Sequence, residues 1–446
     1  MRRLALPTFV FFCHTFQPAG SALAAEDADT TTQPSNTVAE QSPAESSAWP
    51  AWLKFGVLER NRMEAPFGVG FKKGADQLYD LNRVRLDVTI KPESWLQFVV
   101  QGQDTRAFAY QNPAGSMQDP VDLRQAYVQV GDGERSGYMA RVGRQEMTYA
   151  GGWLITPSDW GNTGRTLDGA VVSYKQSGLK VDVLTASAML PDPTRFDRHR
   201  PGDRMSGAYG WLDKLVPKAS IEPFLFYRTQ LNVVSESSRH GESDSFNGGV
   251  RMVGRLPGRF DYSTLIVSQW GSYAGDGISG LAGAHAIGWT INSSAWKPRI
   301  SAEYDHASGD HGSKDGHHET FDQCYGGFHS LLGIADRLGW RNSRNRRVGV
   351  DFMPLRKLKL VTDFRDLSLA TVKDAMYDAS GAKSVFNSKA TSAHVGLELD
   401  SYAVYQLTKT ANIGGGVGHL FPGAYLIQST KGGSYTFPYL MVTKTF

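Results

Sequence analysis

The 446-residue sequence is poor in cysteine and has no long apolar segment. Its two cysteines are Cys13 and Cys324, and Cys13 lies in an N-terminal apolar run, so a processed chain would keep one thiol and no internal disulfide. We expect Cys324 to be a quiet, semi-buried thiol. Beyond the N-terminal run there is no stretch of 18 or more apolar residues, which excludes an ordinary membrane-spanning helix.

Neither sign of charge dominates the sequence. The formal net charge is +3, from 47 basic and 44 acidic residues. This balance is too small to favour a nucleic acid as partner. There is also no phosphate-binding loop, so we expect no nucleotide to drive the protein directly, and we predict no cofactor.

The N-terminus has the pattern of a secretory signal peptide. Arg2 and Arg3 precede an apolar run over residues 4–16 and the small-residue motif Ala22-Leu23-Ala24. We predict a signal peptide over residues 1–24, with cleavage after Ala25 as the second choice. Residues 25–50 are rich in Ser, Thr, Pro and Ala without apolar periodicity, which predicts a disordered periplasmic tail before a folded part over residues 51–446.

The rest of the sequence repeats one pattern. Along residues 83–90, charged or polar residues at odd positions alternate with Val, Leu and Ile at even positions, as in a strand with two different faces. Similar stretches of about ten residues end at Gly, Pro, Asn or Asp, and short turns such as 175–178 contrast with long polar connections such as 191–210. This layout predicts an all-β fold, a transmembrane antiparallel β-barrel.

The strand number follows from length. The folded ~395 residues, at about 22–25 per strand and connection, give 16 to 18 strands, and we choose 18. A soluble β-sandwich or propeller is the alternative, but no repeat of blade length is visible. If the apolar positions of residues 83–90 face lipid, then Arg83, Arg85 and Asp87 face the lumen, because charges on the lipid face cost a few kcal/mol at mid-depth.

The C-terminal segment fits the end of such a barrel. Leu440, Val442 and the terminal Phe446 share one parity, although Lys444 occupies a place that is more often apolar or aromatic. Aromatic residues near predicted strand ends are typical of an interfacial girdle. The girdle candidates are Trp49, Trp52, Tyr138, Trp153, Trp160, Tyr435 and Tyr439.

Several motifs, taken in order, resemble the alginate export family of outer-membrane porins. They are VDLRQAYV (121–128), RVGRQEMTYAGG (141–152), GRTLDGAVV (164–172), EYDHASGD (303–310), FDQCYGGFHSLLGIADRLGWRN (321–342), LELDSYAVYQLTK (397–409) and a GxGxxFPGxYL stretch near 412–426. The resemblance implies a monomeric 18-stranded barrel in the bacterial outer membrane. Its constricted, electropositive lumen would pass an anionic polysaccharide, an alginate-like polyuronate, by passive diffusion, with acidic residues loosening the grip.

On this resemblance we expect ten residues to line the pore. Arginine suits the basic role because it binds a carboxylate through two parallel hydrogen bonds. The basic candidates are Arg83, Arg85, Arg124, Arg144 and Arg165, and the acidic candidates are Asp87, Glu146, Asp168, Glu303 and Glu398. The implied partners are the polysaccharide, outer-membrane lipid and possible periplasmic export partners that hand over the chain.

Two of these arginines have the wrong parity for the lumen. Arg124 shares parity with Val128, and Arg144 shares parity with Val142. Either they lie at strand ends, or a bulge shifts the register. The charged residues of the motifs GRQE (143–146) and RTLDG (165–169) could instead pair with each other and stabilise the barrel wall.

Two further readings compete with a conduit for polyuronate. A general anion or oligosaccharide uptake porin would have similar lumen chemistry, and the direction of flow cannot be deduced from residues. A lipid-hydrolysing outer-membrane enzyme would need more than the nearby pairs His306/Ser308 and His329/Ser330, which lack a nucleophile elbow. We therefore predict no enzyme.

A histidine-rich segment offers a possible metal site. Residues 310–319 carry three histidines and three acidic residues, but their spacing matches no closed zinc pattern. We predict a solvated external loop and no metal.

Overall fold

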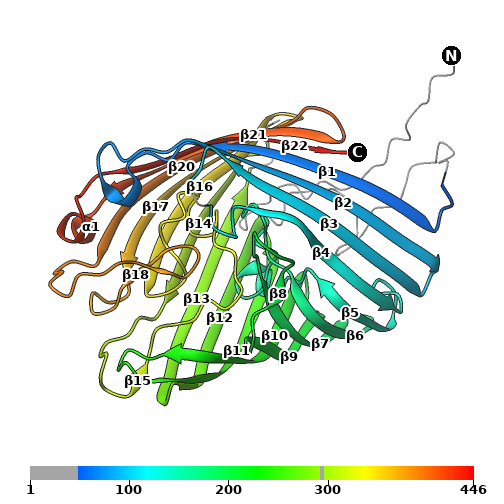
Figure 1. The fold of residues 1–446 in the computed structure, drawn as a ribbon, viewed down its shortest axis with the longest axis horizontal. Coiled ribbons are helices and arrows are strands. Elements are labelled where there is room, and N and C mark those ends of the chain that lie inside the picture. Colours follow the sequence, from blue (N-terminus) through cyan, green and yellow to red (C-terminus); the bar gives the residue numbers. More distant parts are fainter. Residues whose placement is uncertain (1–48, 112, 292–295) are drawn as a thin grey trace.

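The computed structural model describes residues 49–111, 113–291 and 296–446. The signal peptide predicted for residues 1–24, and the predicted tail over residues 25–50 up to residue 48, lie outside these ranges. Figure 1 shows the chain as one closed ring of long strands. Within the described residues, no helix combines the length and the apolar character that crossing a membrane would require.

The barrel has 18 strands, as predicted, and they run antiparallel between neighbours. In chain order they are β1 (Leu53–Glu64), β2 (Tyr79–Glu93), β3 (Leu96–Phe108), β4 (Asp119–Val130), β5 (Gly137–Gln145), β6 (Leu167–Gln176), β7 (Leu179–Leu190), β9 (Arg204–Val216), β10 (Ala219–Val234), β11 (His240–Leu256), β12 (Phe260–Tyr273), β13 (Asp276–Thr290), β14 (Arg299–Ala307), β16 (Ser343–Leu355), β17 (Leu358–Leu369), β20 (His394–Gln406), β21 (Ala411–Pro422) and β22 (Tyr435–Thr445). Strand β1 pairs with β2 on one side and with β22 on the other, which closes the ring.

The connections differ between the two ends of the barrel. Tight turns such as 176–179 and 355–358 lie at one end, together with the C-terminus, and the longest loops (145–167, 307–343 and 369–394) lie at the other. In outer-membrane barrels the short turns are periplasmic, so the long loops surround the extracellular mouth. The connections at the mouth end, including shorter ones, contain the elements η1 (Val69–Phe71), η2 (Ala150–Gly152), β8 (Arg198–His199), β15 (His317–His318), β18 (Met376–Tyr377), β19 (Lys383–Val385) and α1 (Ala424–Ser429).

The period-two pattern places apolar side chains outside. On β2, Leu86 is 57% exposed, whereas Arg83 and Arg85 on the opposite face are buried. On the last strand Leu440 and Val442 are exposed and face outward, and Phe446 follows them in parity. Lys444 shares this outer face, and its ammonium lies 4.1 Å from the centroid of the Phe446 ring, which gives a cation an acceptable place there.

The aromatic girdle prediction is only partly right. Trp49, Trp52 and Tyr138 are exposed. The other four candidates are wrong: Tyr435 and Tyr439 occupy inward positions of β22, and Trp153 and Trp160 belong to a loop that enters the barrel. Exposed aromatics near the strand ends include Trp95, Trp289 and Phe421.

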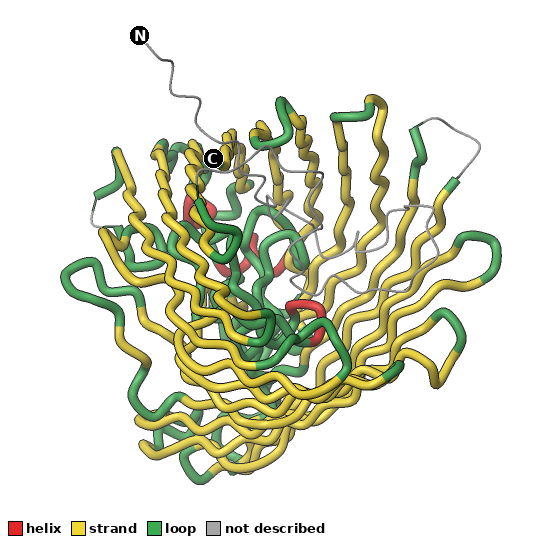
Figure 2. Tube along the Cα trace, turned by 90° about the vertical axis from the view of Figure 1, so that its right-hand side faces the viewer, coloured by secondary structure: helices red, strands yellow, loops and turns green. Residues whose placement is uncertain are grey.

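Two long loops, residues 146–166 and 308–342, fold into the barrel. Figure 2 shows loop segments inside the ring of strands. Their apolar residues share a core with inward side chains of the wall: Trp153 packs on Trp340 with ring centroids 4.7 Å apart, and the same cluster contains Phe226 of β10. This core covers the inner face of the wall from β6 to β13, and the inner face of β1–β4 is mainly polar, with Leu81 and Val99 among its apolar members.

Candidate functional site

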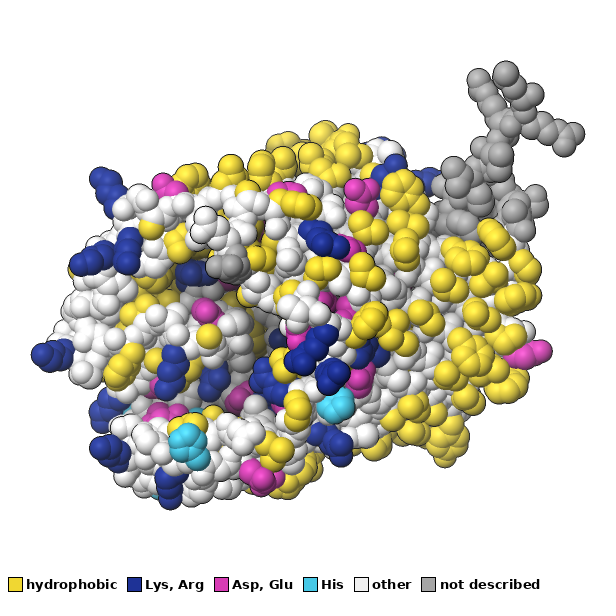
Figure 3. Space-filling model, in the orientation of Figure 1, with side chains coloured by type: hydrophobic (Ala, Val, Ile, Leu, Met, Phe, Trp, Pro, Cys, Tyr) yellow, Lys and Arg dark blue, Asp and Glu magenta, His cyan; other side chains and the backbone are white. Residues whose placement is uncertain are grey.

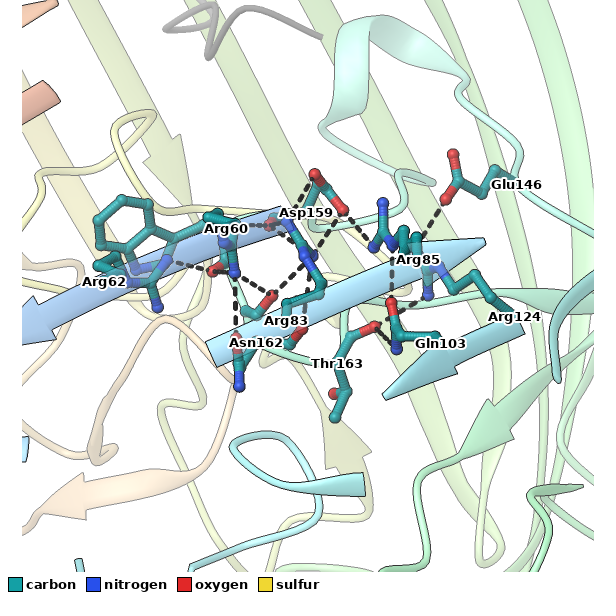
Figure 4. Close-up of polar contacts among 12 residues, drawn as sticks. Arg60, Arg62, Arg83, Arg85, Gln103, Arg124, Glu146, Asp159, Asn162 and Thr163 are labelled. Carbon is teal, nitrogen blue, oxygen red and sulfur yellow. Dashed lines mark hydrogen bonds and ion pairs between the residues drawn. The ribbon is translucent and has the colours of Figure 1, made fainter. Parts of the chain in front are cut away.

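Five arginines lie side by side on the inner face of neighbouring strands, and we call them the arginine cluster. Figure 4 shows them pointing toward one loop inside the barrel. Each is at most 6% exposed, and Arg60 of β1 stands directly opposite Arg83 of β2. The cluster consists of Arg60, Arg62, Arg83, Arg85 and Arg124.

The carboxylate of Asp159, on the inner loop 146–166, binds two of these arginines. Arg83 holds it as a fork, with Nη1–Oδ1 at 3.0 Å and Nη2–Oδ2 at 3.1 Å, and Arg85 Nη2 donates to Oδ1 at 2.7 Å. Burial alone would raise the pKa of Asp159, but the Arg83 and Arg85 guanidiniums outweigh it and hold the pKa well below its usual range. The Asp159 side chain is still 39% exposed.

The remaining arginines bind the backbone of the same loop. Arg60 Nη1 donates to the Asp159 carbonyl at 2.7 Å, and Arg62 Nη1 donates to the Trp160 carbonyl at 2.6 Å. The Arg62 guanidinium also lies 3.7 Å from the centroid of the Trp160 ring. Trp160 stacks in turn on His329 of the second inner loop, at 3.7 Å between centroids. The arginines therefore position both inner loops.

A bulge brings Arg124 into the cluster. Along β3 and β4, Gln101 pairs with Gln125 and Gly102 pairs with Leu123, so Arg124 has no register partner. One extra residue on β4 reverses the parity beyond it. Arg124 therefore points inward although Val128 faces outward, and its side chain binds the Thr163 carbonyl at 3.1 Å and Glu146 at 2.8 Å.

Asp87 lies on the same inner face. The Gln101 amide donates to its carboxylate. The neighbouring Gln103 accepts a hydrogen bond from Arg85 Nε at 2.7 Å. The structure thus brings Arg83, Arg85, Arg124, Asp87 and Glu146 into one region of the inner wall.

Arg165, Glu303 and Glu398 lie inside the barrel, and their hydrogen bonds go to partners outside the arginine cluster. Arg165 ties the two inner loops together through the carbonyls of Tyr325 and Gly326, and burial lowers its pKa to about 10. Glu303 of β14 binds Arg347 of β16 at 2.9 Å. Glu398 of β20 accepts a hydrogen bond from the Ala335 amide at 3.2 Å.

Glu303 belongs to a second charged network, on β12 and β14–β20. There three arginines pair with five carboxylates: Arg299 with Asp261 and Asp351, Arg347 with Glu303 and Asp363, and Arg365 with Asp363 and Asp400. The two networks therefore differ in charge: carboxylates outnumber arginines in the second network, whereas five arginines lie together on the β1–β4 side.

Arg144 and Asp168 do not join either network. They are direct register partners on β5 and β6, with Arg144 Nε 2.9 Å from Asp168 Oδ1. Arg144 also stands opposite Ala126, whose partner Val100 is 49% exposed on the outer face. Arg144 and Asp168 therefore have the parity of the outward-facing residues, and they lie side by side on the neighbouring strands β5 and β6.

The histidine-rich segment forms separate pairs. His311 Nδ1 is 2.8 Å from Glu319, and His318 Nδ1 is 2.8 Å from Glu236 on a different loop. The Ser308 hydroxyl donates to the Glu319 carbonyl at 2.6 Å. These contacts tie the long loop to itself and to its neighbours.

Sequence reasoning missed Arg60, Arg62 and Asp159, and it assigned Trp160 to the aromatic girdle instead of the site. In the segment 53–64 the apolar residues at 53, 55 and 57 alternate, but Glu59 and Asn61 interrupt the pattern beside the two arginines, so periodicity alone does not mark them. Asp159 lies in an irregular loop, where no periodicity marks an inward side chain.

Figure 3 shows hydrophobic side chains over one flank of the barrel and charged side chains around the hollow near its centre. An apolar belt around a closed antiparallel barrel, with charges inside, defines an outer-membrane channel. The alginate export family model matches residues 51–436. The chain belongs to this family, and its place is the bacterial outer membrane.

Solved structures of Pseudomonas aeruginosa porins share the fold. OccK2 (OpdF), in complex with glucuronate, has a TM-score of 0.62 at 12% identity, covering 88% of this chain and 98% of that one. OpdQ has a TM-score of 0.61 at 13% identity over 88% and 98% of the chains. OccK11 (OpdR) has a TM-score of 0.57 at 12% identity over 88% and 96%. No curated protein matches the chain.

Proposed function

We propose that this outer-membrane channel conducts anionic saccharides, with alginate-like polyuronate as the substrate class, by passive diffusion past the arginine cluster. The observation that carries the proposal is the capture of the Asp159 carboxylate by Arg83 and Arg85. A uronate carries the same carboxylate group. The protein's own side chain therefore displays the contact that a substrate carboxylate would make.

The geometry also supports release. A conduit must bind strongly enough to admit its solute and weakly enough to let it leave. Asp159 is partly exposed and competes for the same guanidiniums, and Glu146 competes for Arg124 at 2.8 Å. Each substrate carboxylate would exchange with an internal carboxylate, so the arginines stay paired throughout passage.

We propose that eight of the ten pore-lining candidates line or shape the interior of the channel. Arg83, Arg85 and Arg124, with Asp87 and Glu146, form the substrate-facing part, and Arg165, Glu303 and Glu398 shape the interior elsewhere. Arg144 and Asp168 are left out because their parity belongs to the outer wall. We further propose that the channel acts as a monomer and is not an enzyme.

A general anion or oligosaccharide uptake porin remains the second candidate, because one carboxylate-binding cluster would serve short anions equally well. Chain length separates the two functions. A polyuronate conduit should bind longer chains more tightly, since several weak contacts act together.

Planar bilayers containing the purified protein test the proposal. Under a KCl gradient we expect a reversal potential of the sign that anion selectivity produces. Oligouronates should block the current, and longer chains should block it more strongly. Neutral oligosaccharides should not affect the current. Arg85→Gln should weaken the block about tenfold, because a hydrogen bond between charged groups contributes about 1.5–3 kcal/mol. An unselective pore that ignores uronates would refute the proposal.

The control is Arg106→Gln. Arg106 lies on neighbouring β3, and its side chain is 43% exposed and paired with Asp104 at 2.7 Å. The Arg106→Gln substitution removes one positive charge, as Arg85→Gln does, from the strand next to β2, and Arg106 does not contact the arginine cluster. Block by a monouronate equal to block by long chains would favour the uptake porin.

A further inference from the structure

A group of three aspartates lies at the mouth end of the wall, beside Arg124 of the arginine cluster. Asp119 and Asp122 are on β4, and Asp197 is on the loop between β7 and β9. One carboxylate oxygen from each lies within 4.8 Å of the others. All three line one small cavity, which Thr163 and Thr166 of the inner loop complete.

One member of this group is buried without a partner. Asp119 is 2% exposed, and its Oδ1 is fully buried and has no hydrogen-bond partner among the described residues. A buried carboxylate without a donor costs several kcal/mol unless a cation or a proton neutralises it. Among the described residues no donor reaches this oxygen, so it is available to a bound cation.

The other two aspartates are oriented by hydrogen bonds. Asp122 accepts from the Leu123 amide, from the Asp197 amide at 2.5 Å and from Arg144 Nη1 at 3.4 Å. Asp197 Oδ1 accepts from the Asp192 amide at 2.7 Å. These contacts fix the carboxylates around the cavity while leaving oxygen lone pairs for a further ligand.

Nearby arginines neutralise the group only in part: Arg144 pairs with Asp122 at 3.4 Å, and neither Asp119 nor Asp197 has an ion pair among the described residues. Arg144 is shared with Asp168 at 2.9 Å. Arg124, which also lines the cavity, is paired with Glu146 at 2.8 Å. Burial, together with the Asp122 carboxylate, raises the pKa of Asp197 to about 6, as expected where negative charges are crowded.

We propose that Asp119, Asp122 and Asp197 bind a calcium ion. The donors are all oxygen, which excludes a preference for zinc or copper. Ca²⁺ holds its oxygens at 2.3–2.6 Å and accepts irregular geometry, so ligands on opposite sides of the ion are about 5 Å apart. Mg²⁺ requires a tighter octahedron and retains several waters, which the small cavity does not favour.

The ion would join three parts of the chain: the start of β4, the β7–β9 loop and the cavity face of the inner loop. The inner loop reaches the arginine cluster directly, since the Thr163 carbonyl accepts from Arg124 at 3.1 Å and from Gln103 Nε2 at 3.0 Å. Calcium would thus stabilise the loop that carries Asp159. This inference does not depend on which solute the channel conducts.

The test uses the full barrel, folded in detergent free of lipopolysaccharide and dialysed against EDTA. Isothermal titration with CaCl₂ should show one site per chain, saturated at about 1 mM or below, as in extracellular calcium modules, and Ca²⁺ should raise the unfolding temperature. MgCl₂ should bind at least about tenfold more weakly. Wild-type protein that takes up no Ca²⁺ at this concentration would overturn the proposal, and equal Mg²⁺ affinity would overturn the assignment to calcium.

Variants locate the site. Asp119→Asn and Asp197→Asn should each weaken Ca²⁺ binding at least about tenfold, because ligand charge sets calcium affinity. Asp132→Asn, in the turn at the opposite end of the barrel, is the control and should bind as wild type. Folding is checked by the faster migration of unheated barrel on SDS gels. If folded Asp119→Asn and Asp197→Asn bind like wild type, the ion lies elsewhere and the assignment is wrong.

Discussion

Replacing Asp159 by asparagine tests whether the arginine cluster is a carboxylate site that the protein itself occupies. The amide keeps the shape and one hydrogen-bond acceptor for Arg83 and Arg85, but it removes the charge that competes with a substrate. We therefore expect oligouronates to block Asp159→Asn channels more tightly than wild type, and we expect the anion selectivity to rise.

The size of the effect follows from Coulomb's law. Two carboxylates about 5 Å apart repel by about 1 kcal/mol in water and about 3 kcal/mol at an effective dielectric constant of 20. Because the Asp159 side chain is 39% exposed, the lower half of this range applies. About 1.4 kcal/mol corresponds to a tenfold tighter block.

The assay is a concentration series of one oligouronate in planar bilayers, with block measured from each side of the membrane. Asp104→Asn is the matched control: Asp104 stands opposite Val84 on the outer parity and pairs with Arg106 at 2.7 Å. Its block should equal that of wild type. If Asp159→Asn is blocked as weakly as wild type, or more weakly, the carboxylate does not compete with substrate and the reasoning fails.

Two further predictions concern groups on the loops. Burial, with Asp322 nearby, raises the pKa of the Cys324 thiol to about 12. At pH 8, maleimide should therefore label the folded chain lacking residues 1–24 at least about 100-fold more slowly than the unfolded chain. Rapid labelling of the folded protein would contradict this. The Asp197 carboxyl, with its pKa raised to about 6 beside Asp119, Asp122, Asp192 and Arg144, binds a proton more tightly folded than unfolded. In EDTA, the unfolding temperature of wild type relative to Asp197→Asn should therefore rise as the pH falls from 7 to 5, and Ca²⁺, which needs the ionised carboxylate, should reverse this trend. An identical pH dependence in both proteins would refute it.

Much of the barrel could be predicted from the sequence because a strand between lipid and lumen must alternate. The pattern over residues 83–90 predicts both the strand and the inward direction of Arg83 and Arg85. A single inserted residue defeats the same rule on β4: the parity of Arg124 predicts an outward side chain, and the bulge turns it inward. Periodicity cannot reveal where a bulge lies, so the two possibilities for Arg124 stayed open until the register was known.

The position of the two inner loops inside the barrel could not be predicted from the alternation of apolar and polar residues. Trp153 and Trp160 look like girdle residues because they are aromatic and lie beyond a strand end, yet both are inside the barrel. What places them there is packing against residues far away in the chain, such as Trp340 and His329. Asp159 could not be recognised for the same reason, since its partners are about 75 positions earlier in the chain.

The core shared by the inner loops and the wall has a consequence for how the barrel assembles. It joins residues such as Ala150 and Trp340, which are separated along the chain by eight strands of the barrel. Such distant contacts are entropically costly until the intervening strands have paired. Ring closure should therefore come first and loop docking second, so a newly inserted molecule would pass through a wide, leaky stage. Conductance recorded during refolding into bilayers should then begin high and fall with time, whereas a constant conductance from the first opening would show that the loops dock before the ring closes.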